Sequence, residues 1–176
     1  MPHIAVTVGL PGISGLLDQY PHTGRVLSQL AEALLRGPSP LPAGERELIA
    51  TYVSSLNRCV FCAGSHGAAA EHLLGERDTL SAILADPDSA PISSKLRALL
   101  AIAARVQQGG RAVSDQDVAA ARAEGATDRE IHDTVLIAAA FCMYNRYVDG
   151  LATSTPSDPG DYDRMGQRLA LEGYVR

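Results

Sequence analysis

The chain has 176 residues and a net charge of -5, with 46% hydrophobic and 20% charged residues. This length is typical of one domain that buries a core without disulfides or metals. The acidic balance, with no run of basic residues, argues against nucleic acid and acidic membrane surfaces as partners. Because neither a signal peptide nor a membrane-spanning apolar run is evident, we expect a cytoplasmic protein without membrane contact.

The first half of the chain predicts an arm followed by three helices. Residues 1–25 are expected to form an ordered N-terminal arm, because glycine and proline punctuate them. Apolar residues at helical spacing predict a helix over 25–36. Further helices are predicted over Ala43–Leu56 and Cys59–Leu74. The corner between them is expected at Asn57, a residue type that tolerates a left-handed helix end and can cap the next helix.

The second half predicts further helices and a tail. Two segments have the form of capping boxes, in which a Ser or Thr at the N-cap pairs with an acidic residue three positions later: Ser114–Asp117 and Thr127–Glu130. The predicted elements are an apolar helix within Ser93–Val106, a long helix over Asp128–Gly150, and a C-terminal tail over 153–176 with a short helix near Tyr162–Leu171. Since no strand pairing is evident, the sequence predicts an all-α fold.

The stretch from Cys59 to His66 carries the chemically informative residues. On a helix, Cys59, Cys62 and His66 fall along one face, at steps of three and four residues. A C-x-x-C pair at a helix start suits redox chemistry, because free backbone N–H groups stabilise a thiolate there. Helix-start electrostatics favours Cys59 as the more acidic thiol. Proximity to His66, which could accept a proton, favours Cys62. The sequence leaves both assignments open.

Two other interpretations of these residues need no redox chemistry. Each cysteine could be a small buried apolar residue, with His66 a capped surface histidine. Alternatively, the thiolates and the imidazole could bind zinc. A structural zinc site usually has four ligands, and the fourth candidates, Glu71, His72 and Cys142, lack a second C-x-x-C-like element. We therefore expect no metal and no cofactor.

The residues from Glu47 to His66 resemble the redox motif of the alkylhydroperoxidase D-like branch of the carboxymuconolactone decarboxylase superfamily. That motif has a Glu on one helix, then C-x-x-C, then a His four residues after the second Cys. Glu47, Cys59, Cys62 and His66 match it in order and spacing. Phe61 stands where the founding alkylhydroperoxidase has a second histidine, so His66 is the only imidazole in the motif.

The resemblance extends to other segments and carries expectations for the whole molecule. The segments 10–13, 34–37 and 141–150 are similar to those of the family's peroxidase-related subgroup. The resemblance implies a single helical-bundle domain over 1–176 that assembles as a homo-oligomer, often a trimer or a hexamer.

The resemblance also implies a function, namely a thiol-dependent peroxidase that reduces a small-molecule peroxide and is reset by an external dithiol. In this interpretation Cys62 attacks the peroxide, Cys59 resolves it to a disulfide, and Glu47 polarises His66 or relays its proton. The alternatives are a disulfide reductase, a decarboxylase-like lactone enzyme, and a non-enzymatic helical module that binds zinc or senses oxidation.

Overall fold

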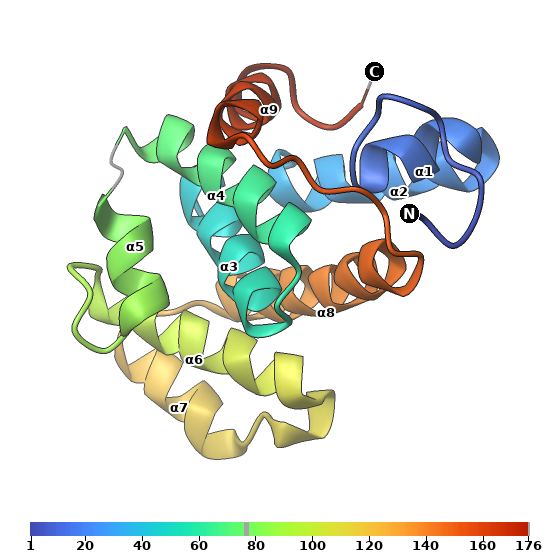
Figure 1. Cartoon of the computed structure of the whole chain (residues 1–176). Helices are drawn as coiled ribbons and strands as arrows, with labels where there is room; N and C mark the ends of the chain where they lie inside the picture. The colour runs from blue at the N-terminus through green and yellow to red at the C-terminus, as the bar shows by residue number, and fades with distance from the viewer. Residues whose placement is uncertain (76–77, 176) are drawn as a thin grey trace.

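The computed structural model describes residues 1–75 and 78–175, and all regular secondary structure in this part of the chain is helical. The all-α expectation is therefore confirmed (Figure 1). The elements, in chain order, are α1 (Ile13–Gln19), α2 (Pro21–Leu35), α3 (Ala43–Leu56), α4 (Val60–Leu74), α5 (Asp78–Ala85), α6 (Ser94–Gln108), the short 3-10 helix η1 (Gly110–Ala112), α7 (Asp115–Ala123), α8 (Asp128–Gly150) and α9 (Pro159–Glu172). Within the described residues, no helix is long and apolar enough to span a bilayer.

Helices α3, α4, α6 and α8 lie within two residues of their predicted bounds. Helices α2 and α9 are longer than predicted, and α9 extends beyond the expected Tyr162–Leu171 at both ends. Both predicted capping boxes form, at Ser114 and Thr127. The expected N-terminal arm, however, contains α1, and α2 begins at Pro21 rather than near residue 25. Proline suits the first turn of a helix, so Pro21 begins a helix instead of interrupting one. Helix α5 was not predicted, because eight residues span barely two turns and give little periodicity.

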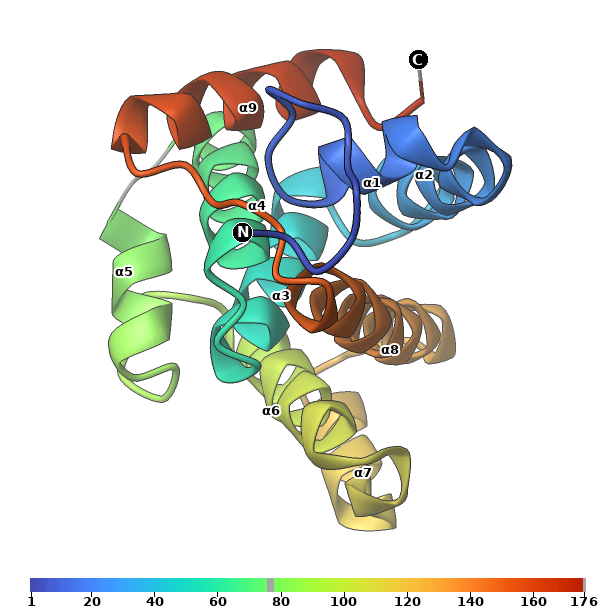
Figure 2. The same cartoon turned by 45° about the vertical axis from the view of Figure 1, so that its right-hand side comes forward.

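Helix α3 lies at the centre of the molecule and explains how a glutamate becomes buried. It packs most extensively on α4, and also contacts α6 and α8 (Figures 1 and 2). Nine of its residues are buried, including polar ones such as Glu47 and Thr51. The far side of α4 is covered by α9. Polar groups of α3 must therefore find partners inside the protein.

The two motif cysteines belong to a small apolar cluster separate from the main core. This cluster consists of Cys59, Phe61, Cys62 and Val148, with Ile13, Tyr162 and Met165 packed against it. Its members come from α1, α4, α8 and α9 and from the residue preceding α4, so the start of α4 is enclosed on several sides. The C-x-x-C pair is thus held in a packed setting at a helix start.

The corner between α3 and α4 differs in detail from the prediction. Asn57 ends α3 in the right-handed helical region, and it is Arg58 that adopts the left-handed conformation, with φ of 60°. Cys59 is the N-cap of α4, whose first helical residue is Val60. The Asn57 side chain does not cap α4. Instead it donates to Asn145 Oδ1 at 2.8 Å, which ties the corner to α8.

Both ends of the described chain are tied to other elements. The N-terminal arm binds the segment after α8 through the Gly12 N–H and the Ser154 carbonyl, 2.8 Å apart. At the other end, Arg36 donates to the Leu169 carbonyl of α9 at 3.0 Å. Figure 2 shows α9 crossing over α4 toward α2. This path delivers the segment that follows α9 to the region around α2 and α3.

Candidate active site

Cys59 and Cys62 are free thiols, and each is nearly inaccessible to solvent, with exposures of 0% and 2%. The thiols lie close enough to share a hydrogen bond. Cys59 is the N-cap of α4, and its side chain makes no capping hydrogen bond. The pair can therefore form a disulfide after local movement at the helix start.

The structure separates the two thiols in acidity. The hydrogen bond with Cys59 is the largest influence that lowers the pKa of Cys62, and the charge of His66 and a hydrogen bond from Asn145 add to it against the effect of burial. The same hydrogen bond to Cys62, reinforced by burial, raises the pKa of Cys59 well above its usual value. The Cys62 backbone N–H lowers the pKa of Cys59, but by less than these influences raise it. The geometry therefore favours Cys62 as the thiolate.

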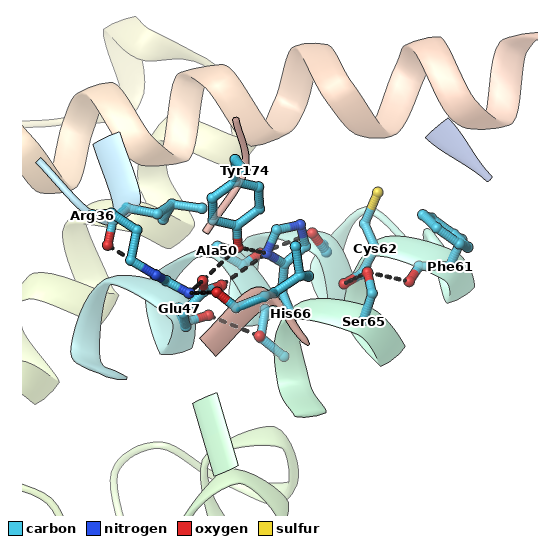
Figure 3. Close-up of polar contacts among 12 residues, drawn as sticks. Arg36, Glu47, Ala50, Phe61, Cys62, Ser65, His66 and Tyr174 are labelled. Atoms are coloured by element: carbon cyan, nitrogen blue, oxygen red, sulfur yellow. Dashed lines mark hydrogen bonds and ion pairs between the residues drawn. The ribbon is translucent and has the colours of Figure 1, made fainter. Parts of the chain in front are cut away.

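Glu47 and His66 form a buried pair beside Cys62. His66 Nδ1 lies 2.8 Å from Glu47 Oε2, and Glu47 is fully buried on α3. Arg36 Nη2 lies 2.7 Å from Glu47 Oε1. Figure 3 shows His66 and the Cys62 sulfur on the same side of α4, with Arg36 beyond Glu47. The structure thus brings together Glu47, Cys62 and His66, three of the four predicted site residues, with Cys59 adjoining Cys62.

The hydrogen bonds of this pair define which nitrogen of His66 can act as a base. Because a carboxylate only accepts hydrogen bonds, the Nδ1–H of His66 donates to Glu47. In a neutral imidazole the proton on Nδ1 leaves Nε2 to accept another. Burial raises the pKa of Glu47, but His66, Arg36 and the Tyr174 hydroxyl together hold it below its usual value, so Glu47 stays ionised.

A cavity of about 680 Å³ opens onto the motif. Cys62 and His66 line it together with Phe61, Phe141 and Tyr174. Most of the remaining lining is apolar and comes from α1, α2 and α9. A small molecule in this cavity can therefore reach the thiol and the imidazole at once, in surroundings that exclude much of the solvent.

Tyr174 and Arg36 are site residues that the sequence analysis missed. The Tyr174 hydroxyl donates to Glu47 Oε1 at 2.5 Å and lies 3.1 Å from His66 Nδ1. Tyr174 is 127 residues from Glu47 in the sequence, and no spacing rule connects them. The C-terminal tail also contains Tyr162 and several apolar residues, so its sequence did not single out Tyr174.

Asn145 and Asp149 lie four residues apart on α8 and both influence the cysteine pair. Asn145 is buried, at 1% exposure, and donates to Ser54 Oγ at 3.0 Å. Its hydrogen bond to Cys62 lowers the pKa of that thiol. Asp149 is exposed but hydrogen-bonded to Cys59, whose pKa it raises. Both residues therefore act on the cysteine pair from α8.

Other candidates lie away from the cavity. The side chain of His132 is 61% exposed and pairs with Asp133 at the start of α8. Cys142 is partly buried and accepts a 3.6 Å hydrogen bond from Asn57. Glu45, in the first turn of α3, is half-buried, which raises its pKa. Across residues 1–75 and 78–175, no group of three or more His, Cys, Asp or Glu side chains is placed to hold a metal ion.

Comparison with known proteins fits this geometry. The sequence model of the carboxymuconolactone decarboxylase family matches residues 21–91 and 88–153. The chain belongs to this family. The matched residues include α2 to α4, with Glu47 and the C-x-x-C motif, and all of α8. No curated protein sequence matches the chain significantly.

Solved structures with the same fold come from several bacteria. A peroxidase-related protein from Silicibacter sp. TM1040 is 28% identical, with a TM-score of 0.76 over 85% of this chain and 78% of its own. A peroxidase-related protein from Ralstonia eutropha JMP134, described as an alkylhydroperoxidase AhpD core, is 26% identical, with a TM-score of 0.79. The match covers 90% of this chain and 82% of the Ralstonia protein. A protein of unknown function from Agrobacterium tumefaciens shares the fold, at 20% identity and a TM-score of 0.71. The match covers 84% of this chain and 99% of the Agrobacterium protein.

Proposed function

We propose that this protein is a thiol-dependent peroxidase in which Cys62 reduces a hydroperoxide and Cys59 resolves the product. One observation carries the proposal: Cys62 and His66 line the same cavity, and a buried, ionised Glu47 accepts a hydrogen bond from His66 Nδ1. This arrangement combines a thiol of lowered pKa, a base and an orienting carboxylate. The Silicibacter and Ralstonia proteins are both described as peroxidase-related, which supports the same class of reaction.

The first step is the attack of the Cys62 thiolate on one peroxide oxygen. His66 Nε2 takes the Cys62 proton, and Glu47 stabilises the imidazolium that results. An S–O bond forms as the O–O bond breaks, and the leaving oxygen takes the proton back from His66. The products are an alcohol, or water from hydrogen peroxide, and a sulfenic acid on Cys62.

The second step closes a disulfide and the third resets it. The Cys59 sulfur attacks the Cys62 sulfenic acid, so an S–S bond forms and the sulfenic oxygen leaves with the Cys59 proton as water. The two electrons lost by the cysteine pair match the two gained by the peroxide. An external dithiol then reduces the disulfide by thiol exchange and is itself oxidised to a disulfide.

The name of the family indicates a second possible reaction, the decarboxylation of a lactone. The paired thiols favour redox chemistry over this reaction. A decarboxylase has no evident use for two cysteines in hydrogen-bond contact. A disulfide reductase would use the same pair without a peroxide. The two redox activities differ in what oxidises the reduced protein, so one assay distinguishes them.

The test offers hydrogen peroxide and a series of organic hydroperoxides, each with several dithiol reductants, and follows consumption of reducing equivalents. We expect catalytic turnover by the wild type, none by Cys62→Ser, and none beyond a single turnover by Cys59→Ser. Cys142→Ser is the matched control, because Cys142 lies away from the cavity, and it should keep wild-type turnover. Equal activity in Cys62→Ser would overturn the proposal.

The role of His66 has its own test. His66→Ala should slow peroxide reduction by ~10²–10⁴-fold, the usual contribution of a general base. The rate should then increase with pH around ~8.5, the pKa of an unassisted thiol, and no longer at lower pH. Glu47→Gln should have the same effect in weaker form. An unchanged pH profile in His66→Ala would remove both residues from the mechanism.

A further inference from the structure

The segment that follows α9 brings Tyr174 to the back of the Glu47–His66 pair. The Tyr174 backbone N–H donates to Glu32 Oε2 of α2 at 2.7 Å, which holds the segment in place. The Tyr174 ring lies parallel to the His66 imidazole, with centroids 5.8 Å apart. Figure 3 shows the phenol reaching over Glu47 and His66. A residue from the far end of the described chain therefore completes the surroundings of the pair.

The Tyr174 hydroxyl fixes one oxygen of the carboxylate while the other serves His66. Glu47 Oε1 accepts from both Tyr174 and Arg36, at 2.5 and 2.7 Å, whereas Oε2 faces His66 Nδ1. Burial and the negative charge of Glu47 raise the pKa of Tyr174 well above its usual value, so the phenol remains a donor. A buried carboxylate with both oxygens bound is restricted to one orientation.

We propose that Tyr174 is a positioning residue that holds Glu47 in the orientation that aligns His66 with Cys62. The inference rests on the proposed peroxidase function, since alignment matters only where His66 accepts the Cys62 proton. Tyr174 acts through Glu47 and His66, not on the sulfur or the peroxide. Arg36 supplies charge to the same oxygen, and the tyrosine hydroxyl adds a directional bond.

The test measures alkylation of Cys62 in the reduced protein by iodoacetamide, with the site mapped by mass spectrometry, across a range of pH. Tyr174→Phe keeps the ring against His66 and removes only the hydroxyl. We expect alkylation at neutral pH to slow by about 10-fold, as is typical of residues that orient a reacting group, and its onset to move to higher pH. Tyr147→Phe, which removes a half-buried phenol outside the cavity, should match the wild type.

Two further variants separate positioning from general loosening of the structure. In a Glu47→Gln background, Tyr174→Phe should have little additional effect, because two residues that act as a unit are not additive. Glu32→Ala frees the Tyr174 backbone N–H but leaves both the ring and hydroxyl in the chain. Glu32→Ala should also slow alkylation of Cys62, but by a smaller factor than Tyr174→Phe does. If Tyr174→Phe does not fold, Glu32→Ala serves as the test.

Three results would overturn the inference: alkylation in Tyr174→Phe within twofold of the wild type, the full 10-fold loss persisting in the Glu47→Gln background, or no change in Glu32→Ala. The assay contains no peroxide. If the wild type reduces no peroxide, the proposed function fails while the alkylation results still decide the role of Tyr174.

Discussion

At Asp149, a single exposed carboxylate acts against thiolate formation at both cysteines. It is hydrogen-bonded to Cys59, and its charge raises the pKa of Cys62 against the larger influences that lower it. The Cys62 thiolate is therefore stabilised by Cys59, His66 and Asn145, whereas burial and the charge of Asp149 disfavour it. This balance can be tested by removing one charge.

We predict that Asp149→Asn lowers the pKa of Cys62 further, because it removes a negative charge that raises this pKa. Because a lower pKa leaves more thiolate at any given pH, the onset of Cys62 alkylation should move to lower pH. Alkylation followed against pH by mass spectrometry measures this. Asp128→Asn at the other end of α8, where the side chain is 84% exposed, is the control and should change nothing. A shift to higher pH would contradict the assigned balance.

The sequence could predict part of the site, and the limits have a physical cause. Glu47, Cys59, Cys62 and His66 were found because helical periodicity and motif spacing are local patterns. Tyr174 depends on the path of α9 across α4, which no local pattern encodes. Asn145 and Asp149 are four residues apart on a predicted helix and so share a face, but the sequence could not show that this face meets the α3–α4 corner.

At the level of elements, Gly166 allows α9 to approach α4. A Cβ built at Gly166 would lie 2.4 Å from the Cβ of Ala68 and 2.7 Å from the backbone nitrogen of Ala69. Backbone atoms of α4 cannot move aside as a flexible side chain could. The close contact of α4 and α9 therefore depends on glycine at this position, and α9 leads to Tyr174.

We predict that Gly166→Ala destabilises the protein by about 1–3 kcal/mol, the usual cost of inserting a methyl group into a closely packed contact. Gly150→Ala is the matched control, because a Cβ at Gly150 meets nothing within 4 Å and alanine favours helix. Chemical denaturation of both variants measures the difference. If Gly166→Ala is as stable as Gly150→Ala, the packing of α9 on α4 is looser than described.

Elements with strong local signals could be predicted closely. The helix Ala43–Leu56 and the capped helix Asp128–Gly150 have the predicted bounds. Helices α1 and α5 were missed because seven and eight residues give too few turns to show periodicity. The left-handed residue at the α3–α4 corner was placed one position early. The Asn57 side chain is bound to Asn145 of α8, and the left-handed conformation occurs at the next residue, Arg58.

At the scale of the whole molecule, burying an ionised glutamate makes stability depend on pH. The pKa of Glu47 in the folded protein lies below its usual value. The ionised carboxylate therefore stabilises the fold fully at pH values above the pKa of glutamate in the unfolded chain. This stabilisation is lost as the pH falls through the lower pKa of the folded protein. We predict that the wild type loses more stability than Glu47→Gln between about pH 5 and pH 3. Thermal unfolding against pH measures both, and parallel curves would contradict this prediction.

We further propose that the protein is a homo-oligomer, a trimer or a hexamer, as its resemblance to the alkylhydroperoxidase D-like branch implies. Leu136 and Met143 are 41% and 43% exposed and lie seven residues apart on one face of α8, which suits an intersubunit contact. Light scattering should give a mass above that of one chain, and Leu136→Glu should lower it. A stable monomer at micromolar concentration would refute this proposal.

The central claim is that Cys62 and Cys59 form a redox pair driven by a peroxide, and a single-turnover experiment tests it most directly. Reduced protein is mixed with one equivalent of an organic hydroperoxide, quenched with an alkylating agent, and mapped by mass spectrometry. The mechanism predicts one equivalent of alcohol and an intrachain Cys59–Cys62 disulfide, with a sulfenic acid on Cys62 in Cys59→Ser. No alcohol, or a disulfide that joins Cys142 to either cysteine as the only oxidised product, would contradict it.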